Sequence, residues 1–313
     1  MKNTNQLYDF TGIRNALFSE VGIGISANTI LLLFHIFTFL LQHKLKPTDL
    51  IIGVLALIHL GMLIILGCTG TNVFVSQDFW NDIKCKSFIS LYRVMRGLSI
   101  CTTCVLSVLQ AVTLSPSGSW LANFKFKSTN TIVWLFLFLW VLTMSISSNL
   151  IFCTVASHNK TQPGLLFLTD HCSFLLMSYS HRYLFIALMA FRDLLFLGLM
   201  VLSSAYMIFL LHRHKQRTMS LHSSRFSPRS SPEQRATHTI LLLISCFEIL
   251  YCVDFIISLF ISVTCTNDPI LVCLQLLVVN GYGTISPLVL ISADIQTIKQ
   301  NPTKCHEISL YDQ

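Results

Sequence analysis

The residues of this sequence best able to do chemistry are charged side chains inside long apolar stretches. They are Arg93, Arg96, Arg192, Asp193, Glu248 and Asp254. An ionised side chain at mid-bilayer costs roughly 2.5–3.5 kcal/mol by insertion scales, so each one requires a partner or a wet cavity. Arginine and carboxylate groups can satisfy each other through charge-assisted hydrogen bonds, and a cavity lined by them could hold a polar group of a ligand.

The depth of each charge below the outer end of its stretch indicates which charges can meet. At about 1.5 Å per helical residue, the depths are ~12 Å for Arg93, ~16 Å for Arg96, ~12–13 Å for Arg192 and Asp193, ~13 Å for Asp254 and ~22 Å for Glu248. Opposite charges on three helices therefore share one level. This predicts a structural ion-pair network, an outward-opening ligand pocket, or both, because the two are compatible. The adjacent Arg192 and Asp193 cannot both face one direction, so at least one of them is expected to be structural.

Seven apolar stretches, each long enough to cross a bilayer as a helix, carry these groups. We place them at 17–41, 48–68, 86–109, 131–152, 184–211, 237–263 and 270–292. The chain is 53% hydrophobic and only 11% charged, which is too apolar for a soluble domain of this length. Helices alone satisfy every backbone polar group within lipid in segments of this length. We therefore predict an all-α membrane protein, a seven-helix domain over 17–292 with a polar segment 1–16 before it and a tail 293–313 behind it.

The distribution of Lys and Arg between the connections predicts the orientation. The connections 42–47, 110–130 and 212–236, together with the tail, hold 12 of these residues, and the opposite set holds six. Because basic residues accumulate on the cytoplasmic side, we expect an extracellular N-terminus and a cytosolic tail. The net charge of +7 then reflects membrane topology, and no nucleic-acid partner is expected.

Cysteines and a glycosylation sequon agree with this orientation. Cys85 opens the third stretch and Cys172 lies in the connection 153–183, both on the oxidising side, where disulfides persist. Sequence alone does not pair cysteines, and Cys265 with Cys273 is an alternative outer bridge. Asn159 begins the sequon Asn-Lys-Thr in the same outer connection.

Several other features favour structural roles. Cys101 and Cys104 form a CxxC pattern in the middle of a stretch, where helix packing is a better interpretation than a metal site. His35 and His59 are single histidines, for which a hydrogen-bonded interior position is expected. The basic, Ser/Pro-rich connection 212–236 is expected to be a flexible cytosolic loop.

The end of the chain carries two further features. Beyond Pro287, Ile291, Ile295 and Ile298 have helical spacing, which predicts a short interfacial helix. Cys305 behind them is a possible site of palmitoylation.

Motifs of the other membrane-protein classes are absent from the sequence. We find no HExxH motif, nucleophile elbow in context or phosphate-binding glycine loop, so an enzyme is not predicted and no cofactor is expected. A re-entrant filter and paired broken helices, which channels and transporters would require, are also absent. These exclusions favour a receptor.

Long runs of the sequence resemble the vomeronasal type 1 receptors, a class of G-protein-coupled pheromone receptors. The runs are ANTILLLFHI, HKLKPTDLIIGVLALIHL, YRVMRGLSICTTCVLSVLQAVTLSPS, SSNLIFCTVASHNKTQ, FRDLLFLGLMVLSSAYMIFLLHRHKQR and NGYGTISPLVLIS. The resemblance implies a multi-pass plasma-membrane receptor for pheromone-like small molecules, volatile or steroid-like, that couples to Gi/Go proteins. It also implies a Cys85–Cys172 disulfide and glycosylation of Asn159.

The sequence departs from the larger rhodopsin-like class of receptors at two positions. Counted from Cys85, Gln110 stands where that class has its ionic-lock arginine, and His59 stands in the region of its sodium-binding aspartate. The residues expected to face the G protein are Gln110, Arg213, Lys215 and Arg217.

The ligand class follows from the charges of the third stretch. Arg93 and Arg96 stand where amine receptors need a carboxylate, so we expect a neutral or anionic ligand with the arginines as polar anchors. The alternatives are a bitter-taste-type receptor, which is distantly similar, and a non-signalling seven-helix membrane protein.

Overall fold

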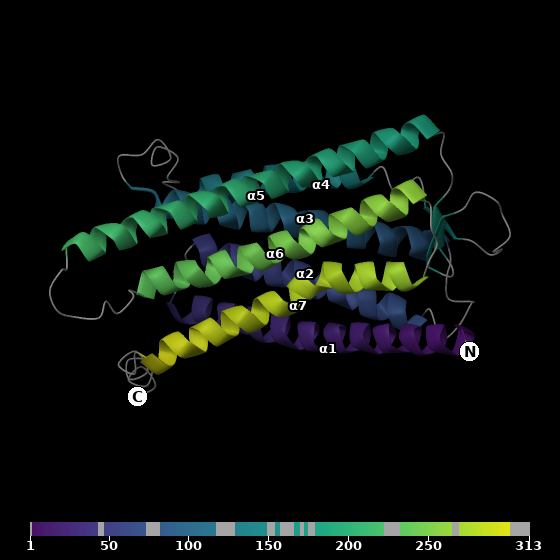
Figure 1. The fold of residues 1–313 in the computed structure, drawn as a ribbon, viewed down its shortest axis with the longest axis horizontal. Helices are drawn as coiled ribbons and strands as arrows, with labels where there is room; N and C mark the ends of the chain where they lie inside the picture. The colour runs from purple at the N-terminus through teal and green to yellow at the C-terminus, as the bar shows by residue number, and fades with distance from the viewer. Residues whose placement is uncertain are drawn as a thin grey trace.

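Seven long helices form a bundle in the computed structural model of the chain (Figure 1). The structure describes residues 2–42, 47–72, 82–116, 129–148, 154–156, 166–169, 172–174, 179–221, 232–264 and 269–300. The helices are α1 (Lys2–Gln42), α2 (Pro47–Asn72), α3 (Asp82–Leu114), α4 (Thr129–Ser148), α5 (Tyr179–Leu221), α6 (Pro232–Thr264) and α7 (Pro269–Gln300). In Figure 1, α1 begins at one end of the bundle and α7 ends at the other, as seven consecutive crossings require.

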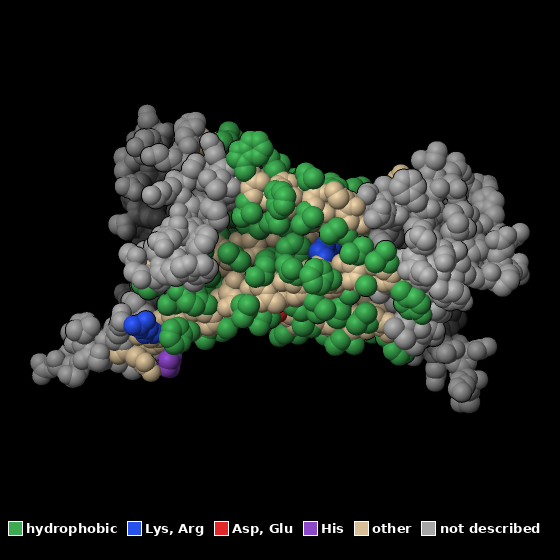
Figure 2. Space-filling model, turned by 90° about the horizontal axis from the view of Figure 1, so that it is seen from above, with side chains coloured by type: hydrophobic (Ala, Val, Ile, Leu, Met, Phe, Trp, Pro, Cys, Tyr) green, Lys and Arg blue, Asp and Glu red, His purple; other side chains and the backbone are tan. Residues whose placement is uncertain are grey.

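Six of these helices have the length and hydropathy of a membrane span within their described residues, and α4 has a shorter apolar stretch, Val133–Ile146. Large apolar side chains are exposed on the outside of the bundle, among them Trp134 and Phe138 on α4. Figure 2 shows that hydrophobic side chains cover the described part of one face, with very few charged ones among them. This surface suits contact with lipid tails, so the architecture agrees with a helical membrane protein.

Proline sets the start of three helices. Pro47, Pro232 and Pro269 are the first residues of α2, α6 and α7. The first turn of a helix has no intrahelical acceptor for its N–H groups, so the missing N–H of proline costs nothing there and its fixed φ favours the helix. Asp49 in the first turn of α2 adds a favourable interaction with the helix dipole.

The third helix, α3, is the centre of the bundle. Within its apolar window 83% of residues are buried, compared with 22% in the windows of α1 and α5. It packs against α2, α4 and α5 and touches α6. A helix surrounded by others can carry polar residues without exposing them to lipid, and α3 buries Ser99, Thr102, Thr103, Ser107 and Gln110.

Helix ends differ from the sequence prediction at several places. The segment 1–16, expected as a polar N-terminal segment, is helical from Lys2 onward. The expectation of a flexible loop over 212–236 is wrong for 212–221 and 232–236, which belong to α5 and α6. Hydropathy reports where a helix meets lipid and not where it ends, and Lys, Arg and Gln are good helix formers in water.

The helical conformation predicted after Pro287 is confirmed, but it is the end of α7 and not a short helix of its own, because α7 continues through that proline to Gln300. Pro287 has no N–H to donate to the carbonyl of Gly283, four residues earlier. Asn28 of α1 donates its Nδ2 to that carbonyl over 2.8 Å and so replaces the missing bond. Figure 1 shows α7 changing direction part-way along its length, as a proline inside a helix leads one to expect.

A small antiparallel sheet, which the sequence analysis did not predict, lies in the connection between α4 and α5. Its strands are β1 (Thr154–Ala156), β2 (Leu166–Thr169) and β3 (Cys172–Phe174), in the order β1-β3-β2. Cys172 pairs with Ala156 across the sheet, and β1 contacts α3. The sheet brings the segment that carries Cys172 to the helix in whose first turns Cys85 lies.

Candidate functional site

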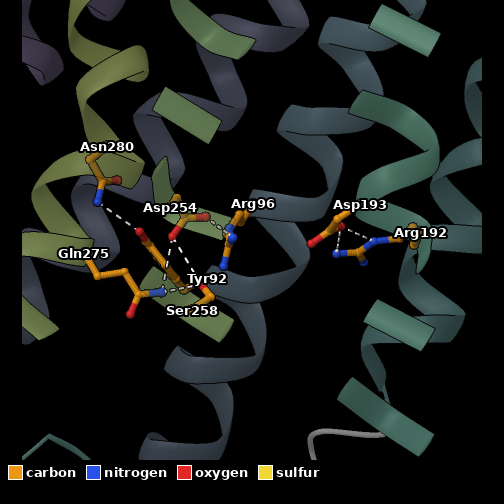
Figure 3. Close-up of polar contacts among 8 residues, drawn as sticks. All are labelled: Tyr92, Arg96, Arg192, Asp193, Asp254, Ser258, Gln275 and Asn280. Carbon is orange, nitrogen blue, oxygen red and sulfur yellow. Dashed lines mark hydrogen bonds and ion pairs between the residues drawn. The ribbon is translucent and has the colours of Figure 1, made fainter. Parts of the chain in front are cut away.

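An ion pair joins α3 to α6 in the interior of the bundle. Arg96 donates from its Nη2 to Oδ2 of Asp254, and Figure 3 shows the two side chains pointing at each other from different helices. The side chain of Asp254 is 1% exposed and that of Arg96 is 22% exposed. Burial of a charge is tolerable only with a partner, so each of these residues depends on the other.

The second oxygen of Asp254 ties α7 into the same network. Ser258, one turn further along α6, donates to Oδ1 over 3.4 Å, and Nε2 of Gln275 on α7 donates to it over 3.2 Å. Gln275 also lies 2.6 Å from the Ser258 hydroxyl. Asp254 is thus held by groups from α3, α6 and α7 at once, which fixes the position of its carboxylate (Figure 3).

A second polar contact links α3 and α7 beside this network. Asn280 donates from Nδ2 to the hydroxyl of Tyr92 over 2.9 Å and to the carbonyl of Leu276 over 2.7 Å. Tyr92 lies one turn before Arg96 on α3, so both side chains project from the same face of the helix. Polar side chains of α3 therefore contact both α6 and α7 at this level, beside the apolar cluster of Val94, Leu98 and Val279.

A cavity of about 20 Å³ lies against the ion pair. It is lined by Met62, Arg96, Ser99, Ile100, Phe247, Leu250, Tyr251, Asp254, Val278, Val279 and Tyr282. That volume holds a water molecule, whereas pockets for drug-sized ligands measure roughly 300–1,000 Å³. A larger ligand would have to displace flexible or aliphatic side chains such as Met62 and Leu250. The chemistry of the lining is an apolar and aromatic wall with one neutralised pair of charges.

Aromatic side chains form the floor and side of this cavity. The ring of Tyr251 lies 5.8 Å from Cζ of Arg96, within range of a cation–π interaction. Phe247 stacks on Tyr251 at 5.7 Å between centroids and meets Tyr282 edge-on at 4.4 Å. Stacked and edge-to-face ring pairs are favourable arrangements, so these contacts stabilise the aromatic part of the cavity wall.

Of the six intramembrane charges that the sequence singled out, the structure brings Arg96 and Asp254 together at the cavity. Arg192 contacts its neighbour Asp193 instead, with Nε and Nη2 each 2.8 Å from Oδ1. Glu248 lies outside the network and accepts a hydrogen bond from Ser204 of α5 over 3.0 Å. Arg93 is half-buried and is not among the residues that line the cavity.

Gly97 explains how Arg192 is accommodated against α3. A Cβ at this glycine would lie 2.7 Å from Cγ2 of Thr143 and 3.1 Å from Nη1 of Arg192. The missing side chain therefore makes room for a guanidinium from α5 and a methyl group from α4. This arrangement places Arg192 beside α3, next to the residue that follows Arg96.

His59 has the interior, hydrogen-bonded position that the sequence predicted, whereas His35 is only half-buried and bonds within its own helix. His59 makes a 2.8 Å hydrogen bond between Nε2 and the Ser99 hydroxyl, and its ring meets Tyr282 edge-on. Gly283 lies against this ring, where a Cβ would stand 3.3 Å from Cγ of His59. His35 donates from Nδ1 to the carbonyl of Leu31 over 2.9 Å. Cys101 and Cys104 are free thiols in the apolar core, in line with a packing role.

The remaining predicted sites divide by what the structure describes. Asn159 and Cys305 lie outside the described residues, and the side chains of Cys85 and Cys172 are not described. Cys273 carries a free thiol, and its alternative partner Cys265 lies outside the described residues.

The residues expected to face the G protein differ in exposure. Gln110 is 8% exposed, so in this conformation it is covered by neighbouring helices, whereas Arg213 near the end of α5 is exposed. Lys215 and Arg217 lie on α5, but their side chains are not described.

Sequence reasoning missed the polar residues that surround the ion pair: Tyr92, Tyr251, Ser258, Gln275 and Asn280. Their uncharged side chains cost less in lipid than charges, so a search for intramembrane charge passes over them. A signal was available in Gln275 and Asn280, the two amide side chains within the seventh apolar stretch.

Comparison with known proteins decides the class of this bundle. Residues 11–301 match the family model for the vomeronasal organ pheromone receptor family. Vomeronasal type-1 receptor 90 of Rattus norvegicus is 50% identical over 291 residues, which cover 93% of this chain and 94% of the relative. The chain belongs to the vomeronasal type-1 receptor family. Vomeronasal type-1 receptor 94 of Rattus norvegicus is 43% identical, over 98% of this chain and 94% of the relative. Vomeronasal type-1 receptor 52 of Mus musculus is 44% identical, over 93% of this chain and 94% of the relative.

Membership of this family confirms the resemblance on which the sequence analysis relied. It makes the protein a receptor of the multi-pass plasma-membrane type and not an enzyme. It also overturns the alternative of a bitter-taste-type receptor.

Proposed function

We propose that this receptor detects small volatile or steroid-like molecules in the cavity between α2, α3, α6 and α7 and signals through Gi/Go proteins. The observation that carries the proposal is the composition of the cavity wall. Aliphatic and aromatic side chains surround a single charged pair, Arg96 and Asp254. Such a wall suits a ligand that is mostly apolar and has one polar group.

The ligand is neutral or anionic in this proposal. A cationic amine would need an accessible carboxylate, and Asp254 already contacts Arg96, Ser258 and Gln275. The polar group of the ligand would instead meet the guanidinium of Arg96, whose side chain is the more exposed of the pair. The proposal includes an N-terminus outside the cell and the tail in the cytosol, the orientation that the basic residues favour.

Signalling requires that a change at the cavity alter the opposite end of the helices. The proposed route is α6, because it carries Asp254 at the cavity and packs against both α5 and α7. Arg213, Lys215 and Arg217, near the end of α5, form the proposed G-protein contact. Gln110 would join it only after the helices that cover it move apart.

Two covalent features complete the proposal on the outer side. A Cys85–Cys172 disulfide is supported by the sheet, because β1 contacts α3 while pairing with the strand that carries Cys172. Glycosylation of Asn159 is supported by its sequon in the same connection. Palmitoylation of Cys305, on the other side, would anchor the tail to the membrane.

The test is a signalling assay in cells that express the chain with an N-terminal tag. Labelling of intact cells with antibody to the tag reports both orientation and delivery to the surface. Volatile and steroid panels are then applied, and Gi/Go activation is recorded with and without pertussis toxin. We expect a dose-dependent response that the toxin abolishes.

The matched variants are Arg96→Gln at the cavity and Arg213→Gln at the exposed end of α5. We expect Arg96→Gln to raise the ligand concentration for half-maximal response, and Arg213→Gln, at the proposed G-protein contact, to lower the maximal response instead. Equal responses of wild type and Arg96→Gln at equal surface expression would refute the assigned ligand site. Silence of a well-displayed wild type to every ligand would favour a non-signalling membrane protein.

A further inference from the structure

The guanidinium of Arg96 is the one cationic group among the described residues that line the cavity. It already forms an ion pair with a carboxylate, that of Asp254. Asp254 contacts its Nη2 and is fixed from the other side by Ser258 and Gln275. Both oxygens of Asp254 therefore have donors within the protein. The pair as a whole adds no net charge to the cavity.

We infer that Asp254 fills the anion-binding position of Arg96 and thereby makes the cavity select neutral ligands with a hydrogen-bond acceptor over anionic ones. The inference rests on the proposed function, because it narrows the ligand class at the same site. It assigns to Asp254 the role of a specificity-determining residue. A ketone, an ester or an alcohol fits the site, whereas a carboxylate or a sulfate ester does not.

Binding of an anionic ligand is unfavourable because of its effect on Asp254. To reach Arg96 in the same way, the anion would have to displace Asp254, whose carboxylate is 1% exposed and would remain buried without its cation. An anion that bound without displacing it would place two negative groups a few ångströms apart in an environment of low dielectric constant. Both routes oppose binding of an anion.

A neutral acceptor avoids both costs. Guanidinium carries five N–H donors in a planar fork, so a ligand carbonyl or hydroxyl can accept from one that Asp254 does not use. The Arg96 side chain is 22% exposed, which leaves part of it open towards the cavity. The ring of Tyr251, 5.8 Å from Cζ, offers an apolar surface for the carbon skeleton beside that acceptor.

The other described arginines of this level do not line the cavity and act on its charged pair only from behind the wall. Arg192 contacts Asp193 at 2.8 Å, and neither residue lines the cavity. Arg93 is not part of the lining either. The charged groups that a ligand in the cavity can touch are therefore Arg96 and Asp254.

Chemical rescue tests the inference without any signalling. Full-length receptor is purified as wild type and as Asp254→Ala, and its midpoint of thermal unfolding is measured in sodium formate or in sodium chloride at equal ionic strength. We expect formate to raise the midpoint of Asp254→Ala by about 2 °C or more, because formate replaces the missing carboxylate at Arg96. Wild type should show no difference between the two salts.

Two outcomes overturn the inference. One is an Asp254→Ala receptor that formate does not stabilise beyond chloride, and the other is an equal effect of formate on wild type. The control is Asp193→Ala, which removes a buried carboxylate from an arginine that does not line the cavity and should show no specific formate effect. If Asp254→Ala yields folded receptor only when produced in formate, that is itself rescue. If it yields none, Asp254→Ser replaces it, because its short side chain also leaves room for formate, with the same expected and opposing results.

A second arm measures ligand preference in cells. A hydroxysteroid and its sulfate ester, and octanol and octanoate, are compared at wild type and Asp254→Asn. We expect the neutral member of each pair to be at least about tenfold more potent at wild type and the ratio to shift towards the anion in Asp254→Asn. Greater potency of the anion at wild type would contradict the inference. Cells silent to every probe would count against the proposed function alone, because the rescue measurement still decides the role of Asp254.

Discussion

Two arginine–aspartate pairs lie in the described part of the bundle, and they are built in opposite ways. Arg96 and Asp254 are far apart in sequence and join α3 to α6. Arg192 and Asp193 are neighbours on α5 and contact each other. The first pair exists only when two helices pack together, whereas the second can form on an isolated helix.

This difference indicates which pair can respond to a ligand. A contact between helices changes when the helices shift, so it can couple a ligand to helix position. A contact within one helix moves with that helix as a unit. It neutralises a buried charge but does not depend on the position of a neighbouring helix. Arg192 of this pair does contact α3, at Gly97.

The largest expected effect is at the pair between helices. Arg96→Gln leaves Asp254 buried without its cation, although Ser258 and Gln275 still donate to it. We expect a loss of about 3 kcal/mol in the free energy of unfolding, the lower end of the range for broken buried pairs. Thermal unfolding of purified receptor measures it. The control Arg213→Gln, at an exposed position, should change stability by less than about 0.5 kcal/mol, and equal losses in both would remove the contrast between them.

The polar contact that crosses from α1 to α7 is expected to rank next. Asn28→Ala leaves the carbonyl of Gly283 without the donor that stands in for the missing N–H of Pro287, a loss of about 1–3 kcal/mol. In a Pro287→Ala background the helix can supply its own N–H, so the same substitution should cost clearly less. Additive losses in the double variant would show that Asn28 acts on something other than that carbonyl.

The close approach of Arg192 to α3 provides a test of packing. Gly97→Ala places a Cβ within 3.1 Å of the Arg192 guanidinium and closer still to Thr143, so we expect a loss of about 1–3 kcal/mol. Gly53→Ala is the control, since a Cβ there meets nothing within 4 Å and alanine is the better helix former by about 1 kcal/mol. Stability that rises in both variants would mean that α5 does not press on α3 at this point.

The smallest effect is expected from the pair within one helix. In double-mutant cycles with glutamine for arginine and asparagine for aspartate, we expect a coupling free energy of about 2–3 kcal/mol for Arg96 with Asp254. For Arg192 with Asp193 we expect about 0.5–1 kcal/mol, because these neighbours still meet when α5 is separated from the bundle. Equal coupling free energies for the two pairs would contradict the distinction between a pair that joins two helices and a pair within one helix.

The sequence alone was enough for the helical class of the protein, its family and the location of its buried charges. Long apolar stretches leave the backbone only one way to satisfy its hydrogen bonds in lipid, so their number and approximate position follow from hydropathy. Depth along a stretch also follows from residue count, which is why counting alone puts Arg96 and Asp254 at similar levels.

The tertiary structure decided which of the equal-depth charges meet and what surrounds them. Rotation of a helix about its axis and the order of neighbours are set by packing of whole side-chain surfaces, which no single residue records. For that reason, the attachment of Asp254 to Gln275, the pairing of Arg192 with its neighbour and the repair of the α7 hydrogen bond by Asn28 appeared only in the folded chain.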